Sequence, residues 1–170
     1  PQGLTNRQAL EYATEAIVGA GYKPGEEVLI ALDPASSEFY ENGNYELNRE
    51  ARRLSSEQMV EEYSRLCADF PIFSIEDGLA EDDWDGWTNH TSISGDHTQL
   101  VGDDLYVTQT RYVQHGIDNK AGNAVLVKLN QVGSVSETLE TINLAKMANF
   151  GVVISHRSGE TEDTSIADLA

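Results

Sequence analysis

The sequence predicts an α/β fold in which a parallel β-sheet is covered by helices. Short apolar runs recur along the 170 residues, most of them rich in Val, Ile or Leu without the strict alternation of half-exposed strands. Segments with helical periodicity lie between these runs, so that strand and helix alternate. The length favours a single domain. The five expected strands are residues 28–32, 72–75, 100–102, 124–127 and 152–155.

Three helices are predicted from the residues with which they begin. In each, a hydroxyl residue is followed three positions later by Gln or Glu, which is the pattern of a capping box. These helices are expected over residues 5–20, 55–70 and 134–148. Weaker helical patterns cover residues 82–93 and 108–115. The acidic run at residues 81–83 is interpreted as a solvated helix start, where the helix dipole favours negative charge.

Residues 38–46 depart from the alternation of strand and helix. Asn42 and Gly43 lie between segments that contain aromatic residues, and an Asn-Gly pair in this setting is a strong signal for a β-hairpin. We therefore expect a hairpin that is inserted on the loop side of the sheet.

The composition argues against several functional classes. The chain has 29 acidic and 11 basic residues, a formal net charge of −18, which is the opposite of what binding to a phosphate backbone requires. No apolar run approaches the roughly 20 residues needed to cross a bilayer. Cys67 is the single cysteine and cannot form an internal disulfide. We therefore expect a cytoplasmic protein that neither binds nucleic acid nor spans a membrane.

A charged or ionisable residue follows each expected strand. The carboxyl ends of parallel strands meet at one edge of a sheet or barrel, where α/β proteins place their active sites. Taken singly, each acid could be a helix cap, the lysine a surface residue and the histidine a structural one. Their shared register on five consecutive βα units favours a common site. The five residues are Asp33, Glu76, Asp103, Lys128 and His156.

The acids among these residues indicate a metal site. Three carboxylates without neighbouring cysteine or histidine ligands favour a hard divalent cation, with Mg²⁺ as the first choice over zinc. We expect Asp33, Glu76 and Asp103 to share this cation. Asp77 and Asp104 are the second acids of two doublets and do not directly continue a strand. We expect these two carboxylates to point elsewhere.

The basic residues indicate proton transfer and anion binding. A positive metal ion lowers the pKa of a neighbouring lysine, so Lys128 could serve as a general base. His156, Arg157 and Ser158 supply donors for a phosphate or carboxylate group, with Arg157 contributing its planar fork. The whole set indicates metal-assisted proton abstraction next to a carboxylate.

Six stretches of the chain resemble signatures of the enolase family, in the family's order and at close to its spacing. The resemblance covers nearly the whole chain, and Gly78-Leu79 after the Glu-Asp pair indicates a bacterial-type member. It implies that residues 1–170 are a single segment of the catalytic barrel domain, a partial (β/α)8 TIM-type barrel of about five βα units. The flanking units and the N-terminal capping domain are then expected outside it. The six stretches are residues 32–39, 74–77, 82–84, 101–105, 126–131 and 155–164.

The resemblance implies an activity and a role for each acid and for the lysine. The activity is the reversible, Mg²⁺-dependent dehydration of 2-phosphoglycerate to phosphoenolpyruvate in glycolysis. Asp33, Glu76 and Asp103 correspond to the ligands of the catalytic Mg²⁺, and Glu76 also contacts the substrate. Lys128 corresponds to the base that removes the C2 proton. Members of the enolase superfamily use a Lys or His base with one or two Mg²⁺ ions.

The resemblance also implies binding residues and partners. His156 corresponds to a substrate-binding histidine, and Arg157 with Ser158 to the phosphate-binding pair. The implied partners are 2-phosphoglycerate and phosphoenolpyruvate, with a homo-oligomer, a dimer or higher, for the full-length parent. By analogy with the family, we expect the protein to be cytoplasmic and also to be displayed on the cell surface.

Other catalytic parts of an enolase are expected outside these 170 residues. They are the general-acid glutamate, the second active-site lysine and a capping-loop serine, so we expect the isolated chain to be inactive. Two alternatives stay open. One is an acid-sugar dehydratase of the same superfamily, against which the anion-binding residues 156–158 argue. The other is a scaffold or surface-binding role, for which no segment specifies a partner.

Overall fold

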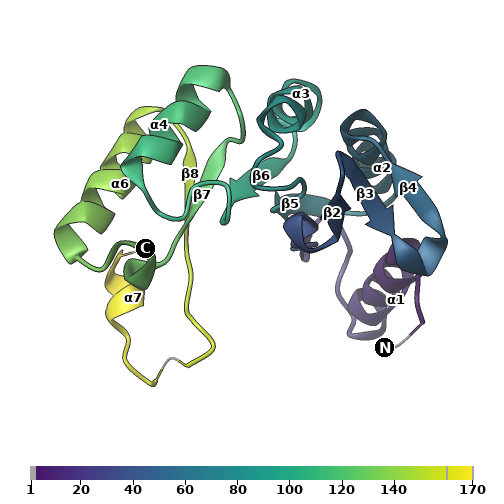
Figure 1. The fold of residues 1–170 in the computed structure, drawn as a ribbon. Coiled ribbons are helices and arrows are strands. Elements are labelled where there is room, and N and C mark those ends of the chain that lie inside the picture. The colour runs from purple at the N-terminus through teal and green to yellow at the C-terminus, as the bar shows by residue number, and fades with distance from the viewer. Residues whose placement is uncertain (1–2, 160, 170) are drawn as a thin grey trace.

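A five-stranded parallel sheet is the centre of the fold. The computed structural model describes residues 3–159 and 161–169. The strand order β1-β5-β6-β7-β8 follows the chain, and every neighbouring pair is parallel (Figure 1). This arrangement confirms the predicted fold class and is consistent with part of a barrel wall. The strands are β1 (Ile30–Leu32), β5 (Ile72–Glu76), β6 (Gln99–Gly102), β7 (Ala124–Val127) and β8 (Gly151–Ile154).

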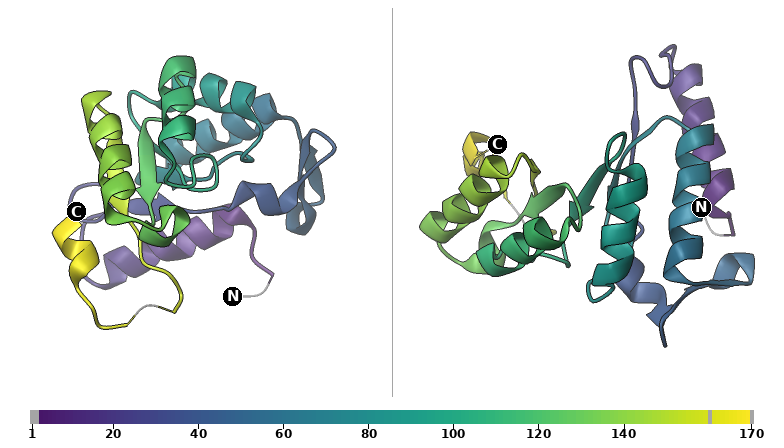
Figure 2. Two further views of the ribbon diagram at one scale, coloured as in Figure 1. Left: turned by 60° about the vertical axis from the view of Figure 1, so that its left-hand side comes forward. Right: turned by 90° about the horizontal axis from the view of Figure 1, so that it is seen from above.

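Helices form an arc around this sheet. Helix α2 packs against α3 and β5, and α6 packs against α4, β7 and β8. Figure 2 shows α4 and α6 at one end of the arc and α1 and α2 at the other. Among the described residues, no helix combines the length and the apolar character that crossing a membrane requires. The helices are α1 (Asn6–Gly19), α2 (Ser56–Asp69), α3 (Trp84–Ser94), α4 (Thr110–Asn119), α5 (Leu129–Val132), α6 (Val135–Met147) and α7 (Ser165–Leu169).

The capping residues predicted from the sequence begin the three strongest helices. The side chain of Thr5 accepts from the backbone of Gln8, and Ser55 does the same with Gln58; both are complete capping boxes. Ser134 accepts from the backbone N–H of Glu137, while its hydroxyl donates to the Glu137 carboxylate. Such caps satisfy N–H groups that have no partner within the helix.

The predicted hairpin is present and carries a third strand. Strands β2 (Tyr40–Glu41) and β3 (Asn44–Leu47) pair antiparallel around Asn42 and Gly43, both of which have positive φ. Strand β4 (Arg52–Leu54), which the sequence did not predict, pairs with β3. Two short 3₁₀ helices, η1 (Ser36–Phe39) and η2 (Asn48–Glu50), flank this small sheet.

The parallel sheet is buried on both faces at its middle strands. Alternate residues of a strand point to opposite faces. Leu100 and Val125 belong to the main core, together with residues of the helices. Val101, Ala124 and Leu126 form a separate small cluster, against which Val153 packs. We call the face of the sheet that carries this second cluster the inner face.

The acidic run before α3 is not wholly solvated, contrary to our expectation. Asp83 caps α3 by accepting from the backbone of Gly86, but its side chain is buried. Its carboxylate also accepts from the Tyr45 hydroxyl and the Ser56 hydroxyl, each at 2.6 Å. These three donors replace the water that a buried carboxylate loses. Asp83 thereby connects the hairpin, α2 and α3.

Tyr106 fills a space that three glycines leave open. A Cβ atom at Gly102, Gly116 or Gly122 would lie 2.6 Å from the Tyr106 side chain. The Tyr106 hydroxyl donates to the carbonyl of Ala121. The ring is fully buried and thereby fastens α4 to the end of β6.

Candidate functional site

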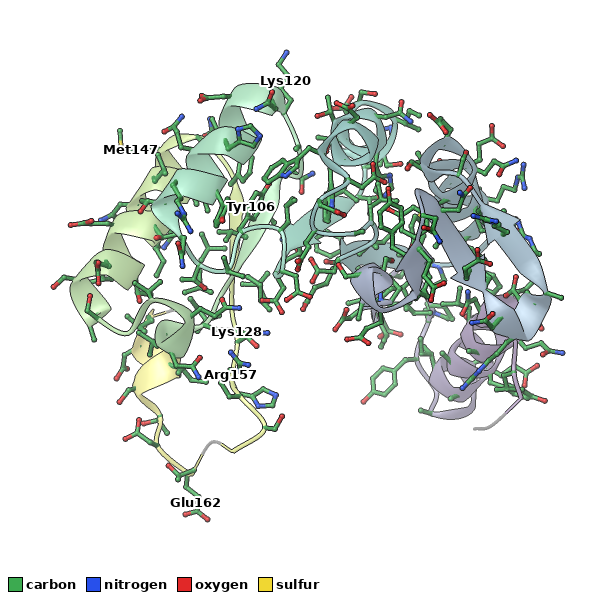
Figure 3. All side chains as sticks on the ribbon, in the orientation of Figure 1. Tyr106, Lys120, Lys128, Met147, Arg157 and Glu162 are labelled. Atoms are coloured by element: carbon green, nitrogen blue, oxygen red, sulfur yellow. The ribbon has the colours of Figure 1, made fainter. Side chains whose placement is uncertain are left out.

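Strand alternation places three of the expected site residues on the inner face. Glu76, Asp103 and Lys128 follow Ser74, Val101 and Leu126 by two residues, and residues two apart in a strand share a face. Val101 and Leu126 belong to the inner cluster. The three ionisable side chains therefore continue the inner face beyond the carboxyl ends of β5, β6 and β7. In Figure 3, Lys128 lies at this end, and Lys120 lies at the opposite end.

Asp103 and Lys128 form an ion pair at the centre of this edge. The Lys128 ammonium donates to Oδ2 of Asp103, and the two side chains are 15% and 10% exposed, respectively. Oδ1 of Asp103 accepts from Nε2 of Gln131 at 3.1 Å. Both oxygens of the aspartate are therefore engaged by residues at or beyond the end of β7.

Thr108 connects this ion pair to the backbone. Its hydroxyl lies 2.5 Å from Oε1 of Gln131 and accepts from the backbone N–H of Lys128 at 2.9 Å. The backbone carbonyl of Thr108 in turn accepts from the Thr141 hydroxyl of α6. A hydrogen-bonded chain thus runs from α6 to the Asp103 carboxylate, which restricts the orientations that this carboxylate can adopt.

Asp77 joins the loop after β5 to the loop after β6. Its two carboxylate oxygens accept from the backbone N–H groups of Asp103 and Asp104 at 2.9 and 3.0 Å. Asp77 has φ 43°, in the left-handed region. Burial raises the pKa of Asp77 to about 7, and the two backbone N–H groups oppose this rise because they stabilise the ionised form.

Glu76 lies in a strongly negative environment. Burial raises the pKa of Glu76 to about 7, and the charges of Asp33 and Asp103 add to the rise, whereas Lys128 opposes it. Asp33 itself is exposed, and its Oδ1 accepts from the backbone N–H of Ala35 at 3.1 Å. The three carboxylates expected to share a cation therefore influence one another electrostatically.

The tightest group of acids differs from the expected one. Among the residues that the structure describes, ligand oxygens of Asp77, Asp103 and Asp104 lie within 4.8 Å of one another. Our expectation that Asp77 and Asp104 point away from Asp103 is therefore wrong. The reason is that Asp77 turns toward the N–H groups of the next loop, which draws it to Asp103. Asp33 and Glu76 lie outside this group.

The donor set fits a hard divalent cation. All the acidic side chains at this edge offer oxygen, which Mg²⁺ prefers. Burial is the main cause of the raised pKa of Glu76, and the charges of Asp33 and Asp103 raise it further, against the opposing charge of Lys128. Burial and the charge of Asp103 likewise raise the pKa of Asp104. A cation bound between these strands would relieve that repulsion.

The residues after β8 are held less firmly. His156, Arg157 and Ser158 are all exposed. Arg157 donates from Nη1 to Oδ1 of Asn130 at 3.1 Å, which places it beside the loop after β7, and Figure 3 shows it on the same side of the sheet as Lys128. Nδ1 of His156 lies 3.0 Å from the carbonyl of Arg157, its own neighbour. The structure thus brings Arg157 near the loop that carries Lys128.

One cavity lies away from this edge. It is a groove of about 510 Å³ between α1, β1 and α2, lined mainly by apolar side chains such as Leu10 and Ile30. Asp33 borders it, but Glu76, Asp103 and Lys128 do not. Glu76, Asp103 and Lys128 therefore lie at the carboxyl ends of the strands and not in this groove.

Three residues of the site were not assigned a role from the sequence. They are Asp77, Thr108 and Gln131, and each forms a hydrogen bond to a residue that follows another strand, 20 to 28 positions away. Their signal is weak because an Asp, Thr or Gln after a strand is common in loops. Gln131 stands out in the sequence only as part of the stretch at residues 126–131 that resembles an enolase signature.

Comparisons with known proteins identify the family. The family model for the enolase C-terminal TIM-barrel domain matches residues 1–170. Enolase 1 of Methanospirillum hungatei is 54% identical over 169 residues, which is 99% of this chain and 40% of that relative. Enolase 1 of Methylococcus capsulatus is 54% identical over 171 residues, 100% of this chain and 41% of that relative. The chain thus spans about two fifths of the length of these relatives. It belongs to the enolase family and lies in its C-terminal TIM-barrel domain.

Proposed function

We propose that the protein to which this chain belongs is a hydro-lyase that converts 2-phosphoglycerate reversibly to phosphoenolpyruvate, in glycolysis and with Mg²⁺ as its cofactor. The observation that carries the proposal is the Lys128–Asp103 ion pair among further carboxylates at the strand ends. Removal of a proton next to a carboxylate needs a base together with positive charge that stabilises the product. Membership of the enolase family supports the same reaction.

The carboxylates are proposed to hold the cation. Asp33, Glu76 and Asp103 come from three different strand ends and offer oxygen ligands around a common region. Bound Mg²⁺ supplies positive charge that stabilises the negative charge developing as the C2 proton leaves. Gln131 orients Asp103 by donating to its Oδ1.

Lys128 is proposed as the base that takes the C2 proton. In the structure its ammonium group donates to Asp103 at the carboxyl ends of the strands. In the forward direction Lys128 acts as the neutral amine, so the ammonium group must first release a proton; Nζ then takes the C2 proton, and the Asp103 carboxylate stabilises the ammonium ion that forms again. In the reverse direction Nζ returns this proton. The backbone bond from Lys128 N to Thr108 keeps the start of the side chain in place.

The loop after β8 is proposed to bind the phosphate. Arg157 presents a planar guanidinium group, which can bind two phosphate oxygens at once. The hydroxyl of Ser158 and the ring of His156 add donors, and all three side chains are accessible to solvent. Because Arg157 already contacts Asn130 beside Lys128, phosphate binding there would place C2 toward the base.

The remaining parts of the proposal concern the whole protein. The general acid that protonates the departing hydroxyl, and the second lysine, are proposed to come from outside these 170 residues. The isolated chain should therefore be inactive. We also propose that the whole protein is a homo-oligomer and works in the cytoplasm, where the thiol of Cys67 stays reduced.

The test is an assay of the whole protein with 2-phosphoglycerate, in which phosphoenolpyruvate is detected by its ultraviolet absorbance. We expect turnover that a chelator abolishes and Mg²⁺ restores. Lys128→Ala should lower kcat by about 10²–10⁴-fold, as expected for loss of a general base. Lys120→Ala is the matched control, since Lys120 is an exposed lysine at the far end of the sheet, and it should change nothing.

Three outcomes would contradict parts of the proposal. Absence of turnover by the whole protein with Mg²⁺ would favour a non-catalytic role. Turnover by Lys128→Ala at the rate of the unaltered protein would remove Lys128 from the mechanism. Rapid turnover by the isolated 170-residue chain would show that the acid and second lysine are dispensable.

A further inference from the structure

Asp77 occupies an unusual place at the carboxyl ends of the strands. Its side chain is only 4% exposed, and both of its carboxylate oxygens accept backbone N–H groups. The buried Asp77 carboxylate is thus directed at the backbone of one neighbouring loop. Although Asp77 belongs to the tightest group of acids, its contacts are those of a residue that holds a neighbouring loop.

The two N–H groups belong to the loop that carries Asp103. Asp103 and Asp104 are the first residues after β6, so the carboxylate of Asp77 fixes the backbone where that strand ends. The backbone of Asp77 makes two further links, since its N–H donates to the carbonyl of Val101 at 2.9 Å and its carbonyl accepts from Ser36 at 3.0 Å. Ser36 lies in the loop that follows Asp33.

Asp77 therefore contacts all three segments that supply carboxylates. It follows Glu76 directly in the chain, it bonds to the backbone of Asp103, and it bonds to the loop beyond Asp33. We propose that Asp77 is a positioning residue, which sets the cation affinity of the proposed Mg²⁺ site by fixing the backbone that carries Asp103. The inference rests on the proposed function only in its choice of cation and of ligands.

The conformation of Asp77 allows the idea to be tested without disturbing the fold. At φ 43°, Asn and Gly are the residues best tolerated, so Asp77→Asn keeps both the shape and the backbone. Asn can accept only one N–H, and its own NH₂ group would face the second. The variant thus breaks one of the two bonds to the loop and removes the charge that strengthens both.

The experiment is a titration of the whole metal-free protein with Mn²⁺, with free Mn²⁺ measured by electron paramagnetic resonance. We expect Asp77→Asn to weaken binding by about 10–100-fold, as is typical when a group that orients a metal ligand is lost. If Asp77→Asn does not fold, Asp77→Gly suits the same backbone and should show a loss of the same order. At saturating Mg²⁺ the kcat of the variant should recover to within a few-fold, which a general loss of stability would not produce.

Asp104→Asn is the matched control. Asp104 belongs to the same tight group of acids, but its side chain is exposed and its backbone N–H stays bonded to Asp77. Removing this screened surface charge should change the Mn²⁺ affinity by only about two- to threefold.

The outcomes separate this inference from the proposed function. Unchanged Mn²⁺ affinity in a folded Asp77 variant would overturn the positioning role. Equal losses in the Asp77 and Asp104 variants would overturn it as well, because they would indicate that the tight group itself binds the cation. A whole protein that binds Mn²⁺ and loses it in Asp77→Asn, yet does not act on 2-phosphoglycerate, would support the inference and contradict the proposed function.

Discussion

The loops after β5, β6 and β7 differ from the loop after β8 in how their side chains are held. In the first group, Asp77 is bonded to the backbone of Asp103, whose side chain is bonded to Lys128 and Gln131. After β8, Arg157 is exposed, and among the described residues its side chain donates one hydrogen bond, to Asn130. The first group is thus a cross-linked network and the second an accessible segment.

This difference indicates a division between a rigid and an adaptable part of the site. The cation and the base must be placed precisely relative to the substrate. The residues that hold them therefore work best when their orientation is fixed before the substrate binds. A loop that binds phosphate has to admit and release the substrate, and loops with few buried contacts open at low cost. Changes in the network should therefore affect cation binding, whereas changes in the loop should affect substrate binding.

The largest effect is expected for Asp103→Ala. This change removes a proposed cation ligand and leaves the ammonium group of Lys128 without its partner in a mostly buried position. We expect the cation affinity of the whole protein to fall by more than about 10²-fold, beyond the ~10–100-fold typical of groups that only orient a ligand. Isothermal titration with Mn²⁺ measures this. Asp118→Ala, at an exposed position of α4, is the control. Retained affinity in Asp103→Ala would remove Asp103 from the network.

A smaller effect, of a different kind, is expected for Arg157→Lys. The lysine keeps the charge but loses the fork that binds two phosphate oxygens. We expect KM for 2-phosphoglycerate to rise by about 10–100-fold, corresponding to the ~1.5–3 kcal/mol of a charged hydrogen bond. The cation affinity should stay unchanged. If Arg157→Lys weakened Mn²⁺ binding as strongly as Asp103→Ala, the division between network and loop would be wrong.

The smallest effect is expected for His90, a buried histidine of α3. His90 is fully buried and stacks on Tyr63, and its ring nitrogens find no hydrogen-bond partner among the described residues. Burial lowers its pKa to about 4. Between about pH 4 and pH 6.5 the His90 imidazole is therefore protonated in the unfolded chain and neutral in the folded protein. The free energy of unfolding falls as the pH falls through this range, and no such loss occurs above about pH 6.5.

His90→Phe should therefore remove part of the acid sensitivity. The ring shape is kept and the unpaired nitrogens are lost, so we expect a gain relative to the unaltered protein on the order of 1 kcal/mol at pH 5. The difference should shrink at pH 7.5. Urea unfolding of the whole protein at both pH values measures it, with His97→Phe at an exposed position as the control. Equal pH dependence in both variants would show that His90 does not carry the sensitivity.

The sheet and most helices could be predicted because their signals are local. Ser55 and Gln58 form the capping box that the sequence indicates, and Val125 to Val127 form a buried strand. Strand β4 was missed because Arg52 and Arg53 carry no strand pattern, and their conformation comes from pairing with β3. Local periodicity does not encode such pairing.

The candidate site shows the same limit. That Asp103 and Lys128 lie together follows from parallel strands and side-chain alternation, both of which the sequence reveals. The role of Asp77 does not, because its partners are the backbone N–H groups of residues 26 and 27 positions away. Asp83 is a parallel case, since its burial depends on Tyr45 and Ser56 in other elements.

The fit of Tyr106 against three glycines restricts how this sequence can diverge. A methyl group added at Gly102 or Gly116 would overlap the Tyr106 ring, and one added at Gly122 would overlap its hydroxyl, so none of these positions can acquire a side chain while Tyr106 remains. The four residues come from different parts of the chain, yet substitutions at these positions depend on one another. Among diverging relatives, side chains at positions 102 and 116 should first arise in lineages in which position 106 has already lost its aromatic ring, whereas position 122 is also restricted by its φ of +76°.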